Sequence, residues 1–366
     1  MQRWPLFLTT LLFFACGEEH NTGYESPDQS DDFQFELKKT SGFVIDSEEL
    51  FLDRVRDVAV FNHDESLIGW INDDRNEIFV TDTQGNYIAK FGSSGSGPSE
   101  FQYITAIGFD SNNNIFTYDP RLGLFKIFTL DGEFSRSMPG LISDDLWSRT
   151  GKIYIRGESM YLGIQETGKA SDENYWQSKI IAEYNLNGEL LKKFGAFDLA
   201  YIESDQDRLY KYPNIYMDHH MGSIYTTHRI HPYINVFDSD TGKHKGRFGI
   251  KSINFSEPSE PARISDPMHI RRKKNLEQSG IGESFTSNDY FFLNFFNMSE
   301  EFYTLQDPNL KEHFFNIFQK EPPYAFLGEI TLDYAPLGVT SDNKVFLLED
   351  DNPDNFKVGI YELVEN

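Results

Sequence analysis

The sequence predicts an all-β fold, a six-bladed β-propeller closed by an N-terminal strand. Six segments repeat a strand, a polar turn and a second strand, and a further hairpin follows most of them. Aromatic residues make up 15% of the chain, with 33 Phe and 19 Tyr, and these side chains favour strands. A length of 366 residues is compatible with one large all-β domain.

The six repeated segments share an apolar start, a turn of Asn, Asp, Ser, Gly or His, and an alternating run of β-branched or aromatic residues. This pattern is typical of a β-hairpin. We expect each segment to form strands A and B, the two strands of a blade nearest the axis. The segments are residues 58–70 (VAVFNHDESLIGW), 106–119 (AIGFDSNNNIFTYD), 144–157 (DDLWSRTGKIYIRG), 214–228 (NIYMDHHMGSIYTTH), 282–295 (GESFTSNDYFFLNF) and 336–350 (PLGVTSDNKVFLLED).

Four second hairpins predict strands C and D of the same blades. They combine an apolar strand, a turn that contains Gly and another strand, and they occupy residues 77–92, 125–139, 179–195 and 233–249. Two successive hairpins make a four-stranded unit that cannot bury both of its faces alone. Such units pack side by side around an axis as propeller blades.

The last unit lacks a strand, because only residues 357–364 remain after the segment at 344–349. Residues 33–37 (FQFEL) alternate apolar and polar side chains and precede the first blade. We therefore expect them to form the outer strand of blade six, which would close the ring and remove an exposed sheet edge.

The N-terminal region predicts export and a lipid anchor. Residues 1–15 read as a signal peptide, with Arg3 followed by an apolar stretch too short to span a bilayer. Residues 12–16 (LFFAC) resemble the lipobox of bacterial lipoproteins, which implies lipid attachment at Cys16 and a membrane as partner. Residues 16–32 are polar and acidic, which predicts a flexible tether, and residues 33–366 are expected to form the propeller.

Charge and cysteine content exclude several function classes. The formal net charge of −25 argues against nucleic-acid binding, which requires clustered Lys and Arg. The basic run at residues 271–274 either pairs with nearby Glu residues or receives an anionic partner. A single cysteine excludes an intramolecular disulfide and a cysteine-rich zinc site. We expect no cofactor and no metal, although His228, His231 and His269 would be the candidate ligands.

Residues 88–119 (IAKFGSSGSGPSEFQYITAIGFDSNNNIFTYD) carry a resemblance to a known group. They contain Phe-Gly, a Gly-Pro-x-Glu-Phe loop and a strand pair that ends in Asp. This run resembles the NHL-like six-bladed propeller lipoproteins of Bacteroidota, and the resemblance fades beyond Gly249. It implies a propeller on the outer membrane; Gly17-Glu18-Glu19 also resembles the acidic signal of lipoproteins on its outer leaflet. The group hosts many activities, so the resemblance does not imply one.

The long connections predict where a ligand binds. A–B and C–D turns share one face of a propeller, whereas B–C and D–A connections share the other. The long segments at 158–178, 196–211, 250–281 and 296–311 all belong to the second face. Polar ends of strand B and nearby aromatic residues make this face the candidate site. The candidate ligand-binding residues are Asp119, Tyr161, Trp176, Tyr201, His228 and Glu349.

Two functions remain open at this point. A binding or scaffolding lipoprotein, with a glycan, peptide or protein ligand, accounts for the anchor and for the lack of a catalytic motif. A propeller lyase or hydrolase acting on glycans or peptides would instead require Asp119, His228 and Glu349 to converge within reach of one substrate atom. No catalytic residue is assigned. The Asp and Asn at these strand ends also have a structural interpretation as caps of the B–C turns.

Overall fold

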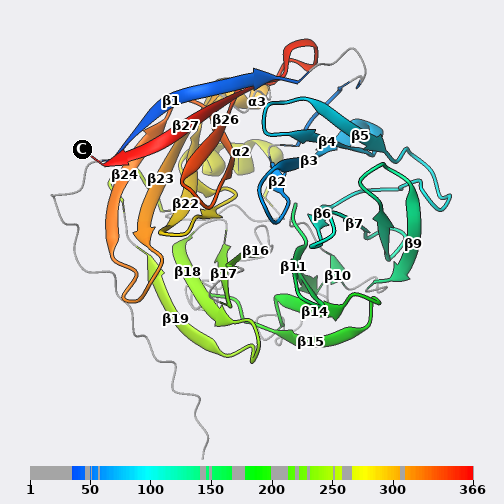
Figure 1. The fold of residues 1–366 in the computed structure, drawn as a ribbon. Helices are drawn as coiled ribbons and strands as arrows, with labels where there is room; N and C mark the ends of the chain where they lie inside the picture. Colours follow the sequence, from blue (N-terminus) through cyan, green and yellow to red (C-terminus); the bar gives the residue numbers. More distant parts are fainter. Residues whose placement is uncertain are drawn as a thin grey trace, which may run out of the picture.

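The computed structural model describes residues 35–45, 50, 52–56, 58–140, 146–147, 151–166, 178–198, 213–218, 222–228, 231–249, 252–257, 266–305 and 310–365. Six antiparallel sheets stand in a ring around a central axis, as Figure 1 shows. The predicted six-bladed all-β propeller is confirmed. No helix among the described residues combines the length and apolar character needed to cross a bilayer.

Blades one and two have the predicted hairpins. Within each blade the strands are hydrogen-bonded in chain order from the axis to the rim. The strands are β2 (Val60–Phe61), β3 (Leu67–Asn72), β4 (Glu77–Asp82) and β5 (Tyr87–Phe91) in blade one, and β6 (Ala106–Phe109), β7 (Ile115–Asp119), β8 (Leu124–Phe128) and β9 (Phe134–Pro139) in blade two.

Blades four and five follow the same plan, and blade five has an additional short inner strand. Strands β20 and β21 both pair with β22. The strands are β16 (Pro213–Asp218), β17 (Ser223–His228), β18 (His231–Asp238) and β19 (His244–Gly249) in blade four, and β20 (Gly280–Ile281), β21 (Phe285–Thr286), β22 (Tyr290–Met298), β23 (Lys311–Gln319) and β24 (Phe326–Leu332) in blade five.

Blade three differs from the prediction. Its strands are β11 (Tyr154–Arg156), β12 (Ser159–Gly163), β14 (Ile181–Asn185) and β15 (Leu190–Phe194). Residues 144–157 were expected to be the A–B hairpin, but Tyr154–Arg156 is strand A and pairs with β12 across the turn at Gly157 and Glu158. Gly157 has φ of +58°, a backbone conformation that suits glycine in a two-residue turn. Strand β10 (Leu146–Trp147) instead pairs with β13 (Gln165–Glu166) outside the blade.

Blade six is closed by the N-terminal strand. The sheet runs β25 (Ala335–Val339), β26 (Lys344–Asp350), β27 (Lys357–Glu365) and then β1 (Phe35–Val44). Strand β1 is antiparallel to β27 from the pair Phe35 and Glu365 to the pair Val44 and Lys357. The prediction for residues 33–37 is confirmed from Phe35 onward, and the strand extends seven residues further than expected.

Buried side chains form six clusters, and each cluster joins two neighbouring blades. All six residues of β3 are buried, because both faces of an inner strand pack against a neighbouring blade. Gly108 shows how closely the blades approach: a Cβ there would lie 2.1 Å from the Ile153 carbonyl oxygen. Burial of apolar surface between blades thus stabilises the ring as a whole.

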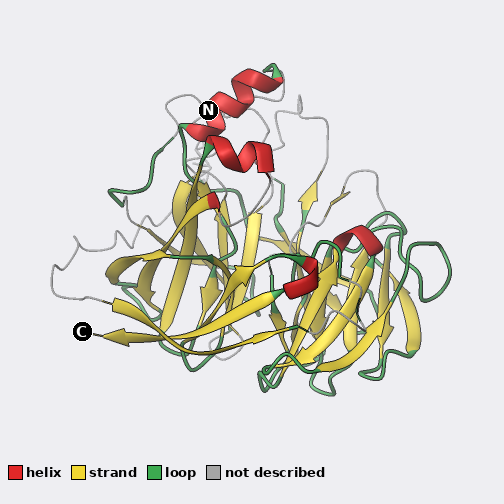
Figure 2. Ribbon diagram, turned by 90° about the horizontal axis from the view of Figure 1, so that it is seen from above, coloured by secondary structure: helices red, strands yellow, loops and turns green. Residues whose placement is uncertain are grey.

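The two faces of the ring differ (Figure 2). Short A–B and C–D turns project from one face, which we call the turn face. Helices α2 (Met268–Leu276) and α3 (Glu300–Leu305) lie on the opposite face, the loop face. The short 3₁₀ turns η1 (Asp73–Arg75) and η4 (Pro353–Asn355) lie in two B–C connections.

Candidate functional site

Two cavities lie on the propeller axis. The loop-face cavity has a volume of about 680 Å³ and is lined by the beginnings of inner strands and by B–C connections. The turn-face cavity has a volume of about 350 Å³ and is lined by the ends of inner strands and by A–B turns. Both volumes fall in the range of roughly 300–1,000 Å³ that is typical of small-molecule sites.

The two cavities are the ends of one axial channel. Gly151 lines the loop-face cavity, and the next residue, Lys152, lines the turn-face cavity. Glu283 and Ser284 are divided between the cavities in the same way. Because consecutive residues of two inner segments pass from one cavity to the other, Lys152 and Glu283 mark the middle of the channel, which we call the waist.

Burial perturbs both charged groups of the waist. Burial raises the pKa of the Glu283 carboxyl, although the positive charges of Lys152 and Arg56 act in the opposite direction. Burial lowers the pKa of the Lys152 ammonium, and the charge of Glu283 opposes that change. Within the described part of the chain, no hydrogen bond or ion pair involves the Glu283 carboxylate, so this group can contact a ligand.

Arg56 is held rigidly in one wall of the loop-face cavity. Its guanidinium donates hydrogen bonds to the Asp73 carboxylate, to the Thr105 carbonyl oxygen at 2.8 Å and to the Ile104 carbonyl oxygen at 3.0 Å. These contacts join blades one and two. Arg54 lies beside it with a side chain that is 70% exposed, 3.8 Å from Asp73.

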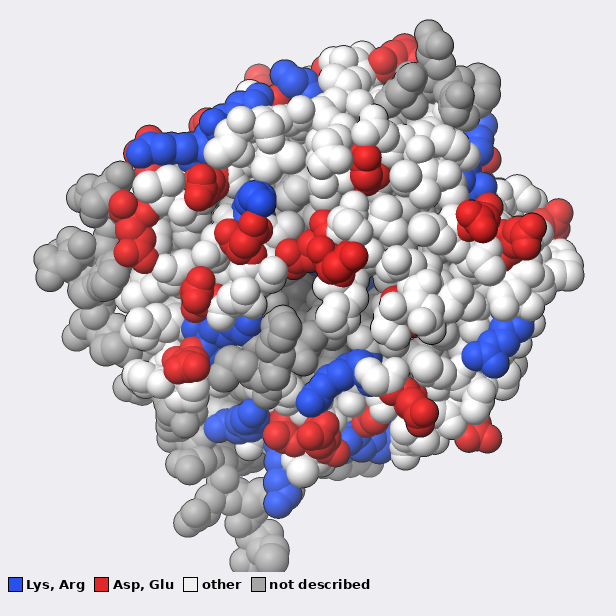
Figure 3. Space-filling model, viewed as in Figure 1, with Lys and Arg blue, Asp and Glu red and all other residues white. Residues whose placement is uncertain are grey.

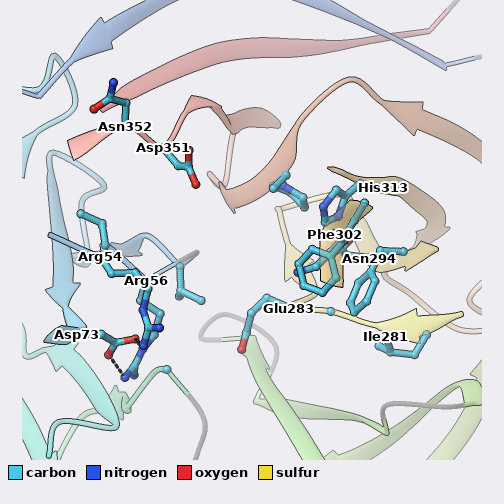
Figure 4. A pocket seen from close by; sticks show the side chains of 18 of the residues that line it. Arg54, Arg56, Asp73, Ile281, Glu283, Asn294, Phe302, His313, Asp351 and Asn352 are labelled. Atoms are coloured by element: carbon cyan, nitrogen blue, oxygen red, sulfur yellow. Dashed lines mark hydrogen bonds and ion pairs between the residues drawn. The ribbon is translucent and has the colours of Figure 1, made fainter. Parts of the chain in front are cut away.

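Aromatic side chains form the opposite wall. Phe302 of α3, Phe296 of β22 and His313 of β23 line the cavity. Figure 4 shows Glu283 in the space between Phe302 and the arginines. The Lys311 ammonium lies 4.6 Å from the centre of the Phe302 ring and 4.9 Å from that of Phe296. The cavity therefore offers charges of both signs beside flat apolar surfaces.

The predicted site residue Asp119 lies at the end of β7, as expected, and caps its B–C turn. Its side chain is fully buried. One carboxylate oxygen accepts hydrogen bonds from the backbone amides of Arg121 and Leu122 at 3.0 and 3.1 Å, and the other accepts from Gln102 at 2.7 Å and Tyr103 at 3.3 Å. Both oxygens are thus engaged by the backbone of the protein itself.

His228 lies at the end of β17 and is 1% exposed, with its ring 5.5 Å from that of Phe197. Burial lowers its pKa to about 4, although the nearby Asp198 carboxylate opposes this change. Asp198 itself accepts hydrogen bonds from Asn235 at 2.7 Å and from Arg247 at 2.9 Å. His228 belongs to a buried polar cluster of blade four.

Glu349 lies in β26 and points toward the rim. It forms ion pairs with Lys39 of β1 and with Lys357 of β27, the latter at 2.9 Å, and accepts a hydrogen bond from the Tyr361 hydroxyl at 2.9 Å. Burial raises the pKa of its carboxyl, but these three hydrogen bonds outweigh burial and lower the pKa to about 2. Glu349 therefore fastens the closing strand to blade six.

Tyr161 does not lie on a loop. It is in the middle of β12, 3% exposed, in the cluster between blades three and four, because the A–B hairpin begins ten residues later than predicted. Gly157 correspondingly lies in a turn on the turn face. Cys16, Trp176 and Tyr201, together with the predicted signal peptide and tether, lie outside the described residues.

The structure does not bring Asp119, His228 and Glu349 together. They belong to blades two, four and six, each contacts different groups, and neither axial cavity is lined by any of them or by Tyr161. Among the residues that the structure describes, no three His, Cys, Asp or Glu side chains are grouped so as to hold a metal ion.

The basic run at residues 271–274 lies on α2, and three of its side chains have acidic partners. Arg272 pairs with Glu300 of α3, Lys274 with Asp266 at 3.1 Å, and Lys273 with Glu277 at 3.8 Å. Arg272 also lies 5.1 Å from the centre of the Tyr303 ring. This run therefore pairs with acidic residues, which is the first of the two interpretations. The ion pair between Arg272 and Glu300 connects the two helices of the loop face.

Sequence reasoning missed the residues that line the cavities. Arg56, Gly151 and Glu283 all lie before the beginning of an inner strand, whereas the predicted site residues are polar ends of strands and aromatic residues of connections. A signal was available, because Arg56 and Glu283 are charged residues next to apolar inner strands. Phe302 carries no comparable signal, since its position depends on how α3 packs on the loop face.

Comparison with known proteins supports the fold. The model of the DUF5128 family, described as a 6-bladed beta-propeller, matches residues 47–138. These residues include blades one and two, in which the sequence repeat is clearest. No curated protein sequence matches the chain.

Two solved structures share the architecture over nearly the whole chain. A member of the DUF4221 family from Bacteroides vulgatus is 10% identical and has a TM-score of 0.64, with 91% of this chain and 99% of that chain covered. The "Putative exported protein" of Bacteroides fragilis is 11% identical and has a TM-score of 0.59, with 92% and 98% covered. At these identities the similarity establishes the fold alone.

Proposed function

We propose that this protein is a lipid-anchored binding protein of the bacterial cell envelope, and that its ligand, a short oligosaccharide or peptide, occupies the loop-face cavity. The observation that carries this proposal is the cavity of about 680 Å³ at the mouth of the axial channel. A ring of packed blades holds it rigidly, and rigid scaffolds that carry loops over a pocket are common binding sites.

The chemistry of the cavity suits a ligand with polar groups on a flat framework. Phe296 and Phe302 offer apolar faces on which a sugar ring or a peptide side chain can stack. Arg54 and Glu283 provide a donor and an acceptor that face each other across the space (Figure 4). A ligand with hydroxyl or amide groups can satisfy both, and therefore gains orientation as well as contact area.

The anchor is the part of the proposal that concerns location. It is supported by the apolar stretch that precedes Cys16 and by the fold shared with a protein described as exported. We expect Cys16→Ser to remain unprocessed or to appear in the soluble fraction, because lipid attachment would be the membrane-binding feature. Fractionation of cells that express either form provides the measurement. A processed Cys16→Ser protein that still sediments with membranes would contradict the anchor.

Binding in the loop-face cavity is tested with two neighbouring aromatic residues of α3. Phe302 lines the cavity, whereas Tyr303 contacts Arg272 and does not. The protein is screened against an array of oligosaccharides and a library of short peptides. We expect Phe302→Ala to weaken the best ligand at least about tenfold, as for a central aromatic contact, and Tyr303→Ala to change affinity less than about twofold. Equal affinity for the wild type and Phe302→Ala would refute the assignment of this cavity.

A further inference from the structure

The charged residues that line the turn-face cavity are mainly basic, in a protein whose formal net charge is −25. Lys152 and Arg156 of blade three and Lys320 of blade five line it, and Glu65 is the carboxylate among its described lining residues. Figure 3 views this face and shows a central hollow with basic groups along one side and acidic groups along the other.

The fold fixes the position of each of the three cations. The Lys152 ammonium lies 4.9 Å from the centre of the Phe285 ring, and the Lys320 ammonium donates a hydrogen bond to the Ser287 carbonyl oxygen. Arg156 donates from one guanidinium nitrogen to Ser239 Oγ at 2.6 Å and to the Asp240 carboxylate at 3.2 Å. Because these contacts come from the blades themselves, the charges are in place before any ligand arrives.

The carboxylates nearby do not cancel this arrangement. Glu65 accepts hydrogen bonds from the backbone amide of Ser341 at 2.7 Å and from its hydroxyl at 2.9 Å, which hold it against the A–B turn of blade six. Glu283 lies in the waist and lines the other cavity. Three cations therefore share the turn-face cavity with one lining carboxylate, Glu65, that is already engaged. One of the three, Arg156, also forms an ion pair with the exposed Asp240 outside the lining.

We propose that the turn-face cavity is a second binding site, specific for a small anion. Its volume of about 350 Å³ accommodates a molecule of one or two rings. Aromatic side chains, among them Phe61, Tyr154 and Phe285, complete the lining. This combination favours a carboxylate, sulfate or phosphate group carried by a ring over the free inorganic ion, since the ring gains contact with the apolar surface.

The test uses the full-length protein and five probes: glucuronate, benzoate, neutral glucose, inorganic sulfate and inorganic phosphate. Calorimetric titration is expected to detect glucuronate or benzoate but not glucose, and binding should weaken as salt increases. Lys152→Met should weaken the bound anion at least about tenfold. Lys243→Met changes the net charge equally and is the matched control, because Lys243 is exposed in a C–D turn of the same face and does not line the cavity.

Arg156→Gln is the second variant, because its half-exposed side chain at the cavity rim can change without disturbing the waist. A loss of anion affinity in both Lys152→Met and Arg156→Gln, with an unchanged melting temperature, supports the site. The titrations with inorganic sulfate and phosphate show whether the anion must be carried by a ring. Absence of anion binding, or binding equally strong in both variants and in wild type, would overturn the proposal. The outcome is independent of the loop-face cavity, because Phe302→Ala should leave anion affinity unchanged.

Discussion

Removal of strand β1 is expected to cost on the order of 5 kcal/mol of unfolding free energy, a large share of the roughly 5–15 kcal/mol that stabilise most domains. Strand β1 pairs with β27 along its length, and Lys39 forms an ion pair with the buried carboxylate of Glu349. Phe43 is 8% exposed in the cluster between blades six and one, and its burial alone contributes about 2–3 kcal/mol. Phe35 meets Tyr290 of blade five edge to face at 5.7 Å.

The loss of β1 also exposes the edge of β27, which can then pair with another chain. A chain that begins at residue 46 should therefore unfold at lower temperature and aggregate, as measured by urea unfolding and by size-exclusion chromatography. The matched control begins at residue 33 and lacks the predicted signal and tether but keeps β1, and it should behave like a chain that begins at residue 17. Equal stability of the chains that begin at 33 and 46 would show that β1 does not close the ring.

The second large effect concerns His228 and pH. Burial lowers the pKa of His228 to about 4 in the folded protein, against about 6.5 in an unfolded chain. Between these two values the unfolded chain binds more protons than the folded protein, so stability is complete above about pH 6.5 and falls as the pH decreases toward 4. When the difference in bound protons is integrated from pH 7.5 to pH 5, His228 is expected to lower the unfolding free energy by about 2 kcal/mol.

The measurement is the urea-unfolding free energy at pH 7.5 and pH 5, for the wild type and for His228→Gln. Burial also lowers the pKa of His231. The unfolding free energy of the wild type should therefore fall by more than the contribution of His228 alone. His228→Gln should show a pH-dependent loss that is smaller by about 2 kcal/mol than that of the wild type. His63→Gln is the matched control, because His63 is exposed in an A–B turn, and it should retain the wild-type difference. An identical pH dependence in wild type and His228→Gln would contradict the effect of burial.

Most of the fold was predictable because hairpins are local. The alternation of apolar and polar residues and the turn residues between strands are properties of segments of about 15 residues, and five of the six inner hairpins formed as predicted. The prediction for blade three failed for a local reason as well. Residues 144–157 have the residue pattern of a hairpin but do not form one. The actual turn contains only Gly157 and Glu158, and a two-residue turn gives a weak signal in the sequence.

The candidate site was predictable only as a face of the molecule. Unequal connection lengths correctly placed the long segments 250–281 and 296–311, which contain α2 and α3, on the side opposite the short turns. The particular residues could not be chosen in this way, because the interpretation of a polar strand end depends on its partners. Asp119 caps its turn through two backbone amides and binds two more in the connection before β6, and Glu349 holds a strand that begins more than three hundred residues earlier in the chain.

The sequence by itself determined the number of blades, most of the strand pairs and the need for an N-terminal strand, since each depends on side-chain alternation within one segment or on a strand count. Only the tertiary structure decided where charge gathers around the axis. Lys152 and Glu283 are 131 positions apart and interact electrostatically because the ring places blades three and five around one channel. Their burial, and therefore their shifted pKa values, arises from the packing of all six blades, which no single segment encodes.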